Sequence, residues 1–165
     1  MITEILQDAF FAAIAAIGFT AISRPPVRAY FYCAVIAAVG HSIRFVLMNP
    51  QLGDSNIIIS SFVAALFVGI LAVFISPVAH MPAETCFFPA LLPMIPGIYA
   101  YKCFGGLAKC LLTSGEETFN HYFYLFASNG VTCVAVISGM TLGATLPVFI
   151  FKKISFQATR SEKNR

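Results

Sequence analysis

Apolar residues run along this chain in long blocks that charged residues rarely interrupt. Residues 55–83 and 118–151 contain no Asp, Glu, Lys or Arg. A helix rises 1.5 Å per residue, so roughly 20 apolar residues cross a hydrocarbon core of about 30 Å. These blocks therefore predict membrane-spanning helices.

Turn signals divide the blocks into five predicted helices. They cover residues 5–23, 27–48, 56–76, 84–104 and 119–151. We expect Pro77 to end the third helix, because proline cannot continue a regular helix. The fifth helix exceeds the bilayer thickness, so we expect a tilt, a kink near Pro147 or an interfacial first turn. The predicted fold is an all-α integral membrane protein with about five transmembrane helices.

The fourth predicted helix has the hydropathy of a membrane span but contains Pro89, Pro93, Pro96 and Gly97. Each internal proline removes a backbone hydrogen bond and costs about 3 kcal/mol in a regular helix. We therefore expect this segment to be broken. Transporters use interrupted helices to direct backbone dipoles at a substrate. A kinked packing element without a ligand is the alternative interpretation.

Composition excludes an ordinary water-soluble domain. Apolar residues make up 59% of the 165 residues and charged residues 10%, against about 25% charged residues in a soluble domain. The first residues include Glu4 and Asp8 but no Lys or Arg, which argues against a cleavable signal peptide. We predict one polytopic membrane domain over residues 1–152 and a basic cytoplasmic tail over residues 153–165.

The basic residues predict how the chain is oriented in the membrane. Arg24 and Arg28 fall on the same side of five helices as the Lys/Arg-rich tail, whereas Lys102 and Lys109 fall on the opposite side. Cytoplasmic loops are enriched in basic residues, so we expect the N-terminus outside and the C-terminus in the cytoplasm. Orientation explains the net charge of +3 better than nucleic-acid binding, which we do not predict.

Two polar residues in the second predicted helix are candidates for a substrate path. His41 and Arg44 stand three residues apart and therefore share one helix face. An arginine at membrane depth usually faces a cavity, and its guanidinium matches a carboxylate through paired N–H donors. A histidine side chain changes charge near neutral pH, which suits proton coupling. Alternatively, Arg44 extends to the lipid headgroups, because it lies about one turn from the helix end.

Asp8 and Glu84 are the acidic residues nearest to the predicted membrane spans. Asp8 is a candidate counter-ion for Arg44, and Glu84 is a second candidate counter-ion. The alternative is that each lies near a helix start because the helix dipole favours an acidic residue there.

Small residues spaced four apart occur on two predicted helices. Gly139 and Gly143 form such a pair, and so do Ala12 and Ala16. Such stripes let helices approach closely. They predict helix packing, either within the chain or against a partner helix.

The sequence predicts no catalytic residue, no cofactor and no metal site. It contains no H-E-x-x-H motif, no G-x-S-x-G motif and no phosphate-binding glycine loop, so we do not expect an enzyme. The five cysteines form no C-x-x-C pair. We interpret them as buried thiols, with a disulfide between Cys103 and Cys110 as the alternative.

Four motifs resemble the threonine/serine exporter family. They are Ala16-Ile17-Gly18-Phe19, Pro26-Val27-Arg28-Ala29, Gly40-His41-Ser42-x-Arg44 and Leu92-Pro93-Met94-Ile95-Pro96-Gly97-Ile98-Tyr99-Ala100-Tyr101. In particular, the chain resembles the short membrane subunit of the split bacterial form of this family, a type associated with succinate export.

The resemblance implies a transport function in the bacterial inner membrane together with a larger membrane subunit of the same family. Succinate is the implied substrate, with threonine or serine as the alternative. On this hypothesis His41, Arg44 and the segment from Pro89 to Gly97 line the export path. A non-conducting membrane scaffold is the competing interpretation, and a homo-oligomer is an alternative assembly.

Overall fold

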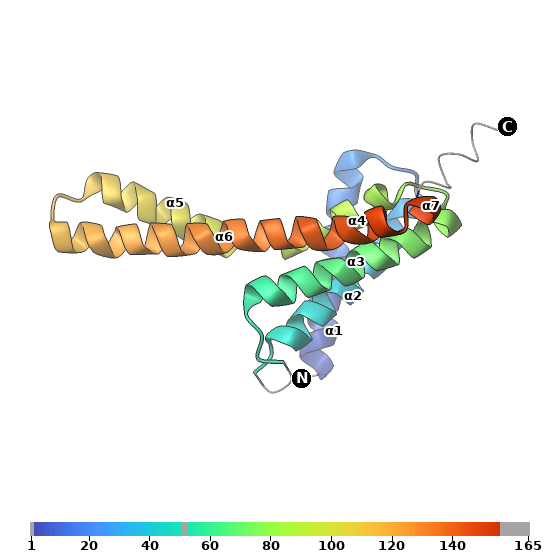
Figure 1. Ribbon diagram of the computed structural model, residues 1–165, viewed down its shortest axis with the longest axis horizontal. Helices are drawn as coiled ribbons and strands as arrows, with labels where there is room; N and C mark the ends of the chain where they lie inside the picture. The colour runs from blue at the N-terminus through green and yellow to red at the C-terminus, as the bar shows by residue number, and fades with distance from the viewer. Residues whose placement is uncertain (1, 51–52, 156–165) are drawn as a thin grey trace. The chain divides into compact units, whose positions relative to one another are not determined.

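The computed structural model describes residues 2–50 and 53–155, and these residues form helices joined by short connections (Figure 1). The elements are α1 (Ile2–Ser23), α2 (Arg28–Met48), α3 (Ile57–Ala79), α4 (Ala83–Leu91), the 3₁₀ turn η1 (Leu92–Met94), α5 (Gly97–Leu112), α6 (Glu116–Ile150) and α7 (Lys152–Ser155). No strand occurs within the described ranges. The predicted all-α fold is confirmed.

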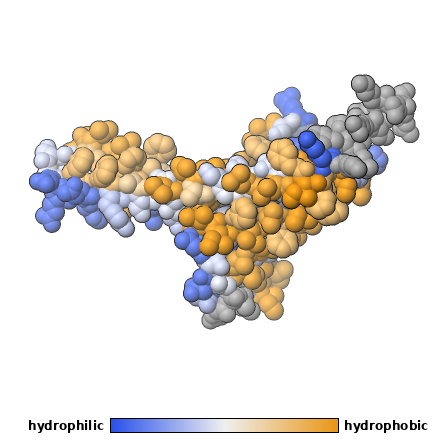
Figure 2. Space-filling model, viewed as in Figure 1, coloured by the Kyte–Doolittle hydropathy of each residue, from blue (hydrophilic) through white to orange (hydrophobic). Residues whose placement is uncertain are grey.

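Among the residues that the structure describes, four helices are long and apolar enough to cross a membrane, namely α1, α2, α3 and α6. Their sides carry large exposed apolar residues such as Phe10, Phe31 and Phe74, each more than half exposed. Figure 2 shows hydrophobic residues along the sides of the helices and hydrophilic residues gathered near several helix ends. Apolar surface of this extent is unfavourable in water and is matched by lipid. The chain is therefore an integral membrane protein.

The predicted fourth helix is broken, as the prolines indicated. α4 ends at Leu91, η1 follows, and the helical path restarts at Gly97 in α5. Pro89 lies inside α4, Pro93 lies in η1, and Pro96 precedes α5 with a ψ of 64°, outside the helical region. The two helices have 9 and 16 residues, and neither reaches the usual length of a membrane span.

The predicted end of the third helix is wrong. α3 does not end at Pro77 but continues to Ala79. A proline in the last turn removes one hydrogen bond without forcing the following residues out of the helix. His80 then ends α3 in the left-handed conformation, with a φ of 54°, and its backbone N–H donates to the Ser76 carbonyl.

The two later boundaries also differ from the prediction. α5 extends to Leu112 rather than ending near residue 104, and α6 begins at Glu116 rather than at residue 119. Glu116 and Glu117 lie in the first turn of α6, where acidic side chains complement the positive end of the helix dipole. These two glutamates precede the apolar block, which alone was used to predict a helix start at residue 119.

The chain forms two compact units, one from residues up to Met94 together with residues from Gly139 onward, and the other from Ile95–Ser138. In the first unit α1 lies against α2, which also packs against α3 and α4. Small residues dominate its buried positions, including Ala12, Ala16, Ala29, Ala37, Ala64, Ala65, Ala72, Ala83 and Ala90. Small residues let helix backbones approach closely in a membrane protein.

The second unit is a hairpin in which α5 lies beside the first part of α6 (Figure 1). A Cβ atom added at Gly106 of α5 would lie 2.9 Å from the backbone nitrogen of Phe126. The Lys109 ammonium lies 4.8 Å from the centre of the Tyr122 ring. Glycine therefore permits the close approach of these two helices, and a cation–π contact joins their polar sides.

The predicted cytoplasmic tail over residues 153–165 is described only at its start. Residues 152–155 form α7. The remaining residues, 156–165, lie outside the described part of the chain.

Candidate functional site

Asp8 of α1 and His41 of α2 form a hydrogen-bonded pair in the first unit. The His41 Nδ1 atom lies 3.0 Å from the Asp8 Oδ2 atom. The His41 side chain is 10% exposed and the Asp8 side chain 33% exposed. A carboxylate only accepts, so the geometry favours an imidazole that carries its proton on Nδ1.

The other ring nitrogen of His41 has no hydrogen-bond partner within residues 2–50 and 53–155. Nε2 is buried and makes no hydrogen bond to the described residues. With the proton on Nδ1, Nε2 holds a free lone pair and can accept a proton or a hydrogen bond. A buried polar atom without a hydrogen-bond partner is uncommon in folded proteins.

Arg44 lies one helical turn after His41 and reaches the broken segment. Its Nη1 atom donates to the Met94 carbonyl at 2.6 Å. Met94 is the last residue of η1, and its side chain is fully buried. The carbonyl groups at a helix end have no helical donor and carry the negative end of the helix dipole, so a guanidinium is a favourable partner.

Arg44 and Asp8 line one open pocket of about 350 Å³. Phe45, Met48, Asn49 and Pro50 complete its walls. Asp8 and Arg44 also interact electrostatically. The volume is at the lower end of the range for small-molecule sites, and the walls combine apolar side chains with two opposite charges.

Pro89 and Pro93 leave backbone carbonyls without helical donors, and one of these carbonyls has a side-chain partner. The Thr85 carbonyl would accept from residue 89 in a regular helix, but proline has no N–H. The Cys33 Sγ atom of α2 lies 3.4 Å from the Thr85 carbonyl oxygen and donates to it. A thiol on the neighbouring helix thus replaces the missing backbone hydrogen bond.

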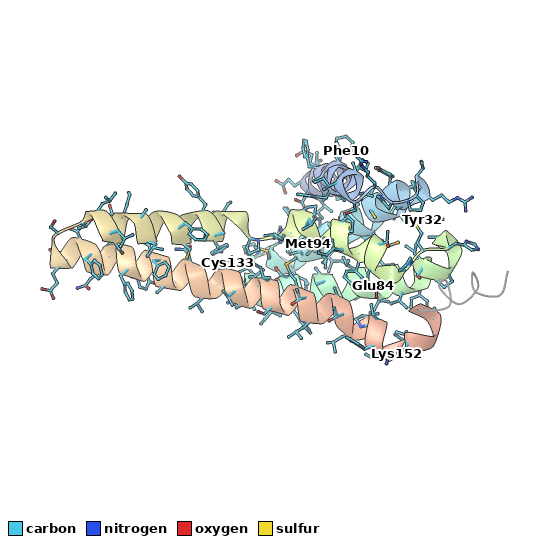
Figure 3. The ribbon with its side chains drawn as sticks, turned by 90° about the horizontal axis from the view of Figure 1, so that it is seen from above. Phe10, Tyr32, Glu84, Met94, Cys133 and Lys152 are labelled. Carbon is cyan, nitrogen blue, oxygen red and sulfur yellow. The ribbon has the colours of Figure 1, made fainter. Side chains whose placement is uncertain are left out.

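Glu84 does not lie in the Arg44 pocket. It lines a separate pocket with Ser23, Pro25 and Pro26, where the connection between α1 and α2 meets the start of α4. Figure 3 labels Glu84, which lies in the first turn of α4, and Met94, which ends η1. Among the pockets of the described residues, the Arg44 pocket is lined by Asp8 and not by Glu84.

The remaining candidates occupy other positions. Pro96 and Gly97 belong to the second unit, where Gly97 opens α5. Gly139 and Gly143 lie on the part of α6 that belongs to the first unit, against α3. A Cβ atom at Gly143 would lie 2.6 Å from the Phe62 carbonyl oxygen, so this glycine packs backbone against backbone.

Two contacts of the site were not predicted from the sequence. The Met94 carbonyl is a backbone group that no residue pattern identifies. The Cys33–Thr85 contact joins residues 52 positions apart. The one available signal was Pro89, because a proline within a helix implies an acceptor four residues earlier that needs another donor.

Metal and disulfide chemistry have no support in the described residues 2–50 and 53–155. No group of three or more His, Cys, Asp and Glu side chains there could hold a metal ion. All five cysteines have free thiols, including Cys103 and Cys110.

Comparison with known proteins identifies the family. Residues 8–150 match the family model described as "Threonine/Serine exporter, ThrE". This match includes Asp8, His41, Arg44 and the whole broken segment.

The chain belongs to the threonine/serine exporter family. An uncharacterized protein of Haemophilus influenzae is 31% identical to it over 150 residues, which are 90% of this chain and 48% of that relative. The chain therefore spans about half the length of this curated relative. No solved structure matches the chain.

Proposed function

We propose that this chain is a membrane subunit of an exporter of small carboxylate metabolites, with the Arg44 pocket as its substrate site. The single observation that carries the proposal is the position of Arg44, whose guanidinium lines an open pocket together with Asp8 near the end of the membrane helix α2. Placing an arginine there is costly, and a carboxylate ligand offers the paired acceptors that a guanidinium fits. Family membership supports transport rather than catalysis.

The broken segment gives the pocket a way to respond to substrate. Arg44 is held by the Met94 carbonyl at the end of η1. A carboxylate that binds the guanidinium competes with this carbonyl, because a charged acceptor forms a stronger hydrogen bond than a neutral one. Substrate binding would then release η1 from α2, which links pocket occupancy to the position of the interrupted helix.

Succinate is the proposed substrate, and threonine or serine is the alternative. The alternative is supported by the description of the family. An amino acid would place its carboxylate on Arg44 and its ammonium group near Asp8, whereas a dicarboxylate has no group for Asp8 to neutralise. Measuring whether excess threonine inhibits the efflux of succinate therefore distinguishes the two substrate classes.

We further propose that the chain acts with a larger membrane subunit of the same family in the bacterial inner membrane. The matched relative extends well beyond the region shared with this chain. Secondary transporters commonly place their substrate site between two repeats or bundles, which also supports a second component. The basic residues favour an external N-terminus and a cytoplasmic C-terminus.

Efflux from membrane vesicles tests the function. Vesicles that contain the chain and its larger partner are loaded with labelled succinate, and the initial efflux rate is measured with and without excess threonine. We expect Arg44→Lys, which keeps the charge but loses the planar fork, to reduce efflux by about tenfold or more. We expect Lys109→Gln, which removes a cation of the second unit, to leave efflux unchanged.

Two results would contradict the proposal. Normal succinate efflux in Arg44→Lys and Arg44→Ala would remove Arg44 from the mechanism. Normal efflux in variants of His41, Arg44 and Pro96, together with loss of the partner from the membrane when Gly143 is replaced, would instead support the scaffold interpretation.

A further inference from the structure

Asp8 is positioned to interact with two cationic groups. It accepts a hydrogen bond from His41 Nδ1 at 3.0 Å, and it shares a pocket and an electrostatic interaction with Arg44. When His41 is neutral, the charges of Asp8 and Arg44 cancel within the pocket. A carboxylate substrate must then compete with Asp8 for the guanidinium.

Few other ionisable groups surround His41. α3 and η1, which face α2, contain no acidic, basic, cysteine or tyrosine residue, and neither does the part of α6 in the first unit. α4 contributes Glu84 and Cys86, and Glu84 lines a separate pocket. Besides Asp8, α1 carries Glu4, which is exposed one turn before Asp8. The charge next to His41 is therefore set mainly by Asp8 and Arg44.

His41 has a place for one additional proton. Nδ1 is engaged with Asp8, and Nε2 is buried without a hydrogen-bond partner among the described residues. A proton that binds Nε2 makes the ring a cation with two N–H donors, and its Nδ1–H still donates to the carboxylate. The imidazolium then neutralises Asp8 in place of Arg44.

We propose that the Asp8–His41 pair takes up one proton when a carboxylate binds Arg44, so that proton binding and substrate binding are positively linked. This proposal rests on the proposed function of the Arg44 pocket. The sign follows from the charges. With the extra proton, the three side chains carry a net charge of +1 and attract an anion, whereas without it their net charge is zero. By reciprocity, a bound carboxylate strengthens proton binding by the same factor.

Calorimetry of the chain together with the proposed larger subunit in lipid nanodiscs tests the linkage with succinate as the ligand. The proton count is obtained by titrating succinate in buffers with different ionisation enthalpies. The wild-type chain is expected to take up a fraction of a proton, up to one, per succinate. Its dissociation constant for succinate is expected to fall as the pH is lowered, by at most about tenfold per pH unit for one linked proton.

Two variants separate the linkage from a structural contribution. His41→Gln keeps an N–H donor for Asp8 but cannot take up the proton, so its affinity for succinate should lose most of the pH dependence. Asp8→Asn removes the charge that competes for Arg44, so it should bind succinate at least as tightly as the wild type near pH 8. A merely structural contribution of Asp8 would weaken binding instead. Titration of succinate itself is common to all variants and cancels in the comparison.

Each outcome decides one claim. Succinate binding by the wild type without proton uptake, or an unchanged pH dependence in His41→Gln, would overturn the linkage and leave the proposed function intact. Absence of succinate binding by the wild type would overturn the proposed function and the linkage with it. If one variant fails to fold, the proton count of the wild type and the other variant still decide the result.

Discussion

At the scale of single residues, side chains donate to backbone carbonyls of the broken segment that have no helical donor. The Cys33 thiol donates to the Thr85 carbonyl, and the Arg44 guanidinium donates to the Met94 carbonyl. Hydrocarbon offers no hydrogen bonds, so irregular backbone at membrane depth requires such donors from neighbouring helices. The same broken segment that needs these donors supplies the acceptor that holds Arg44.

Replacing Cys33 tests whether this compensation contributes to stability. Cys33→Ala leaves the Thr85 carbonyl without its donor, and we expect a loss of about 1 kcal/mol in the free energy of unfolding. Cys33→Ser keeps a hydroxyl donor of similar size and should retain most of the stability. Thermal unfolding of both variants in the same detergent measures the difference, and equal midpoints for the alanine and serine variants would contradict the assignment.

The candidate residues could be predicted from the sequence, but their pairing could not. His41 and Arg44 stood out because polar residues inside an apolar span need a reason. Asp8 had two equally good explanations, as a counter-ion or as a residue near a helix start. Its contact with His41 joins residues 33 positions apart, and the register between α1 and α2 is set by packing of small residues that hydropathy does not resolve.

At the scale of helices, hydropathy and proline predicted the elements better than their ends. The long apolar blocks became α1, α2, α3 and α6, and the proline-rich segment became α4, η1 and α5. The predicted end of the third helix was wrong because a single proline was assumed to end a helix. Pro77 lies near the end of α3 without ending it, because one lost hydrogen bond in the last turn is a small cost for a helix whose other residues are well packed.

Glycine at the contact between α3 and α6 provides a prediction at this scale. Gly143→Ala adds a Cβ atom 2.6 Å from the Phe62 carbonyl oxygen, so the two helices must move apart, and we expect a loss of about 1–3 kcal/mol in unfolding free energy. Gly18→Ala is the matched control, because a Cβ there meets nothing within 4 Å. Since alanine favours a helix more than glycine, this control should be neutral or slightly stabilising.

Unfolding in a common detergent compares the two glycine variants. Equal stability of Gly143→Ala and the wild type would mean that the close contact between α3 and α6 does not limit packing. A large loss in Gly18→Ala would show that small size matters elsewhere on α1, for example against a partner helix.

At the scale of the whole molecule, the chain combines a bundle of membrane helices with an open pocket that is lined by two opposite charges, Asp8 and Arg44. The pocket lies where α2 ends, because Met48, Asn49 and Pro50 form part of its wall. Family membership places this arrangement in a family of threonine/serine exporters. The central claim is that a carboxylate substrate occupies the space beside Arg44.

Substrate protection of a cysteine in the pocket wall tests this claim most directly. The Met48→Cys variant of the chain is produced together with the proposed larger subunit. The rate at which the new thiol reacts with a small maleimide is then measured with and without succinate. Ser23→Cys, which lies at the other end of α1 and outside the Arg44 pocket, is the control. The account predicts that succinate slows the labelling of Met48→Cys severalfold and leaves Ser23→Cys unchanged. Labelling of Met48→Cys that saturating succinate does not alter, in vesicles that still export succinate, would contradict it.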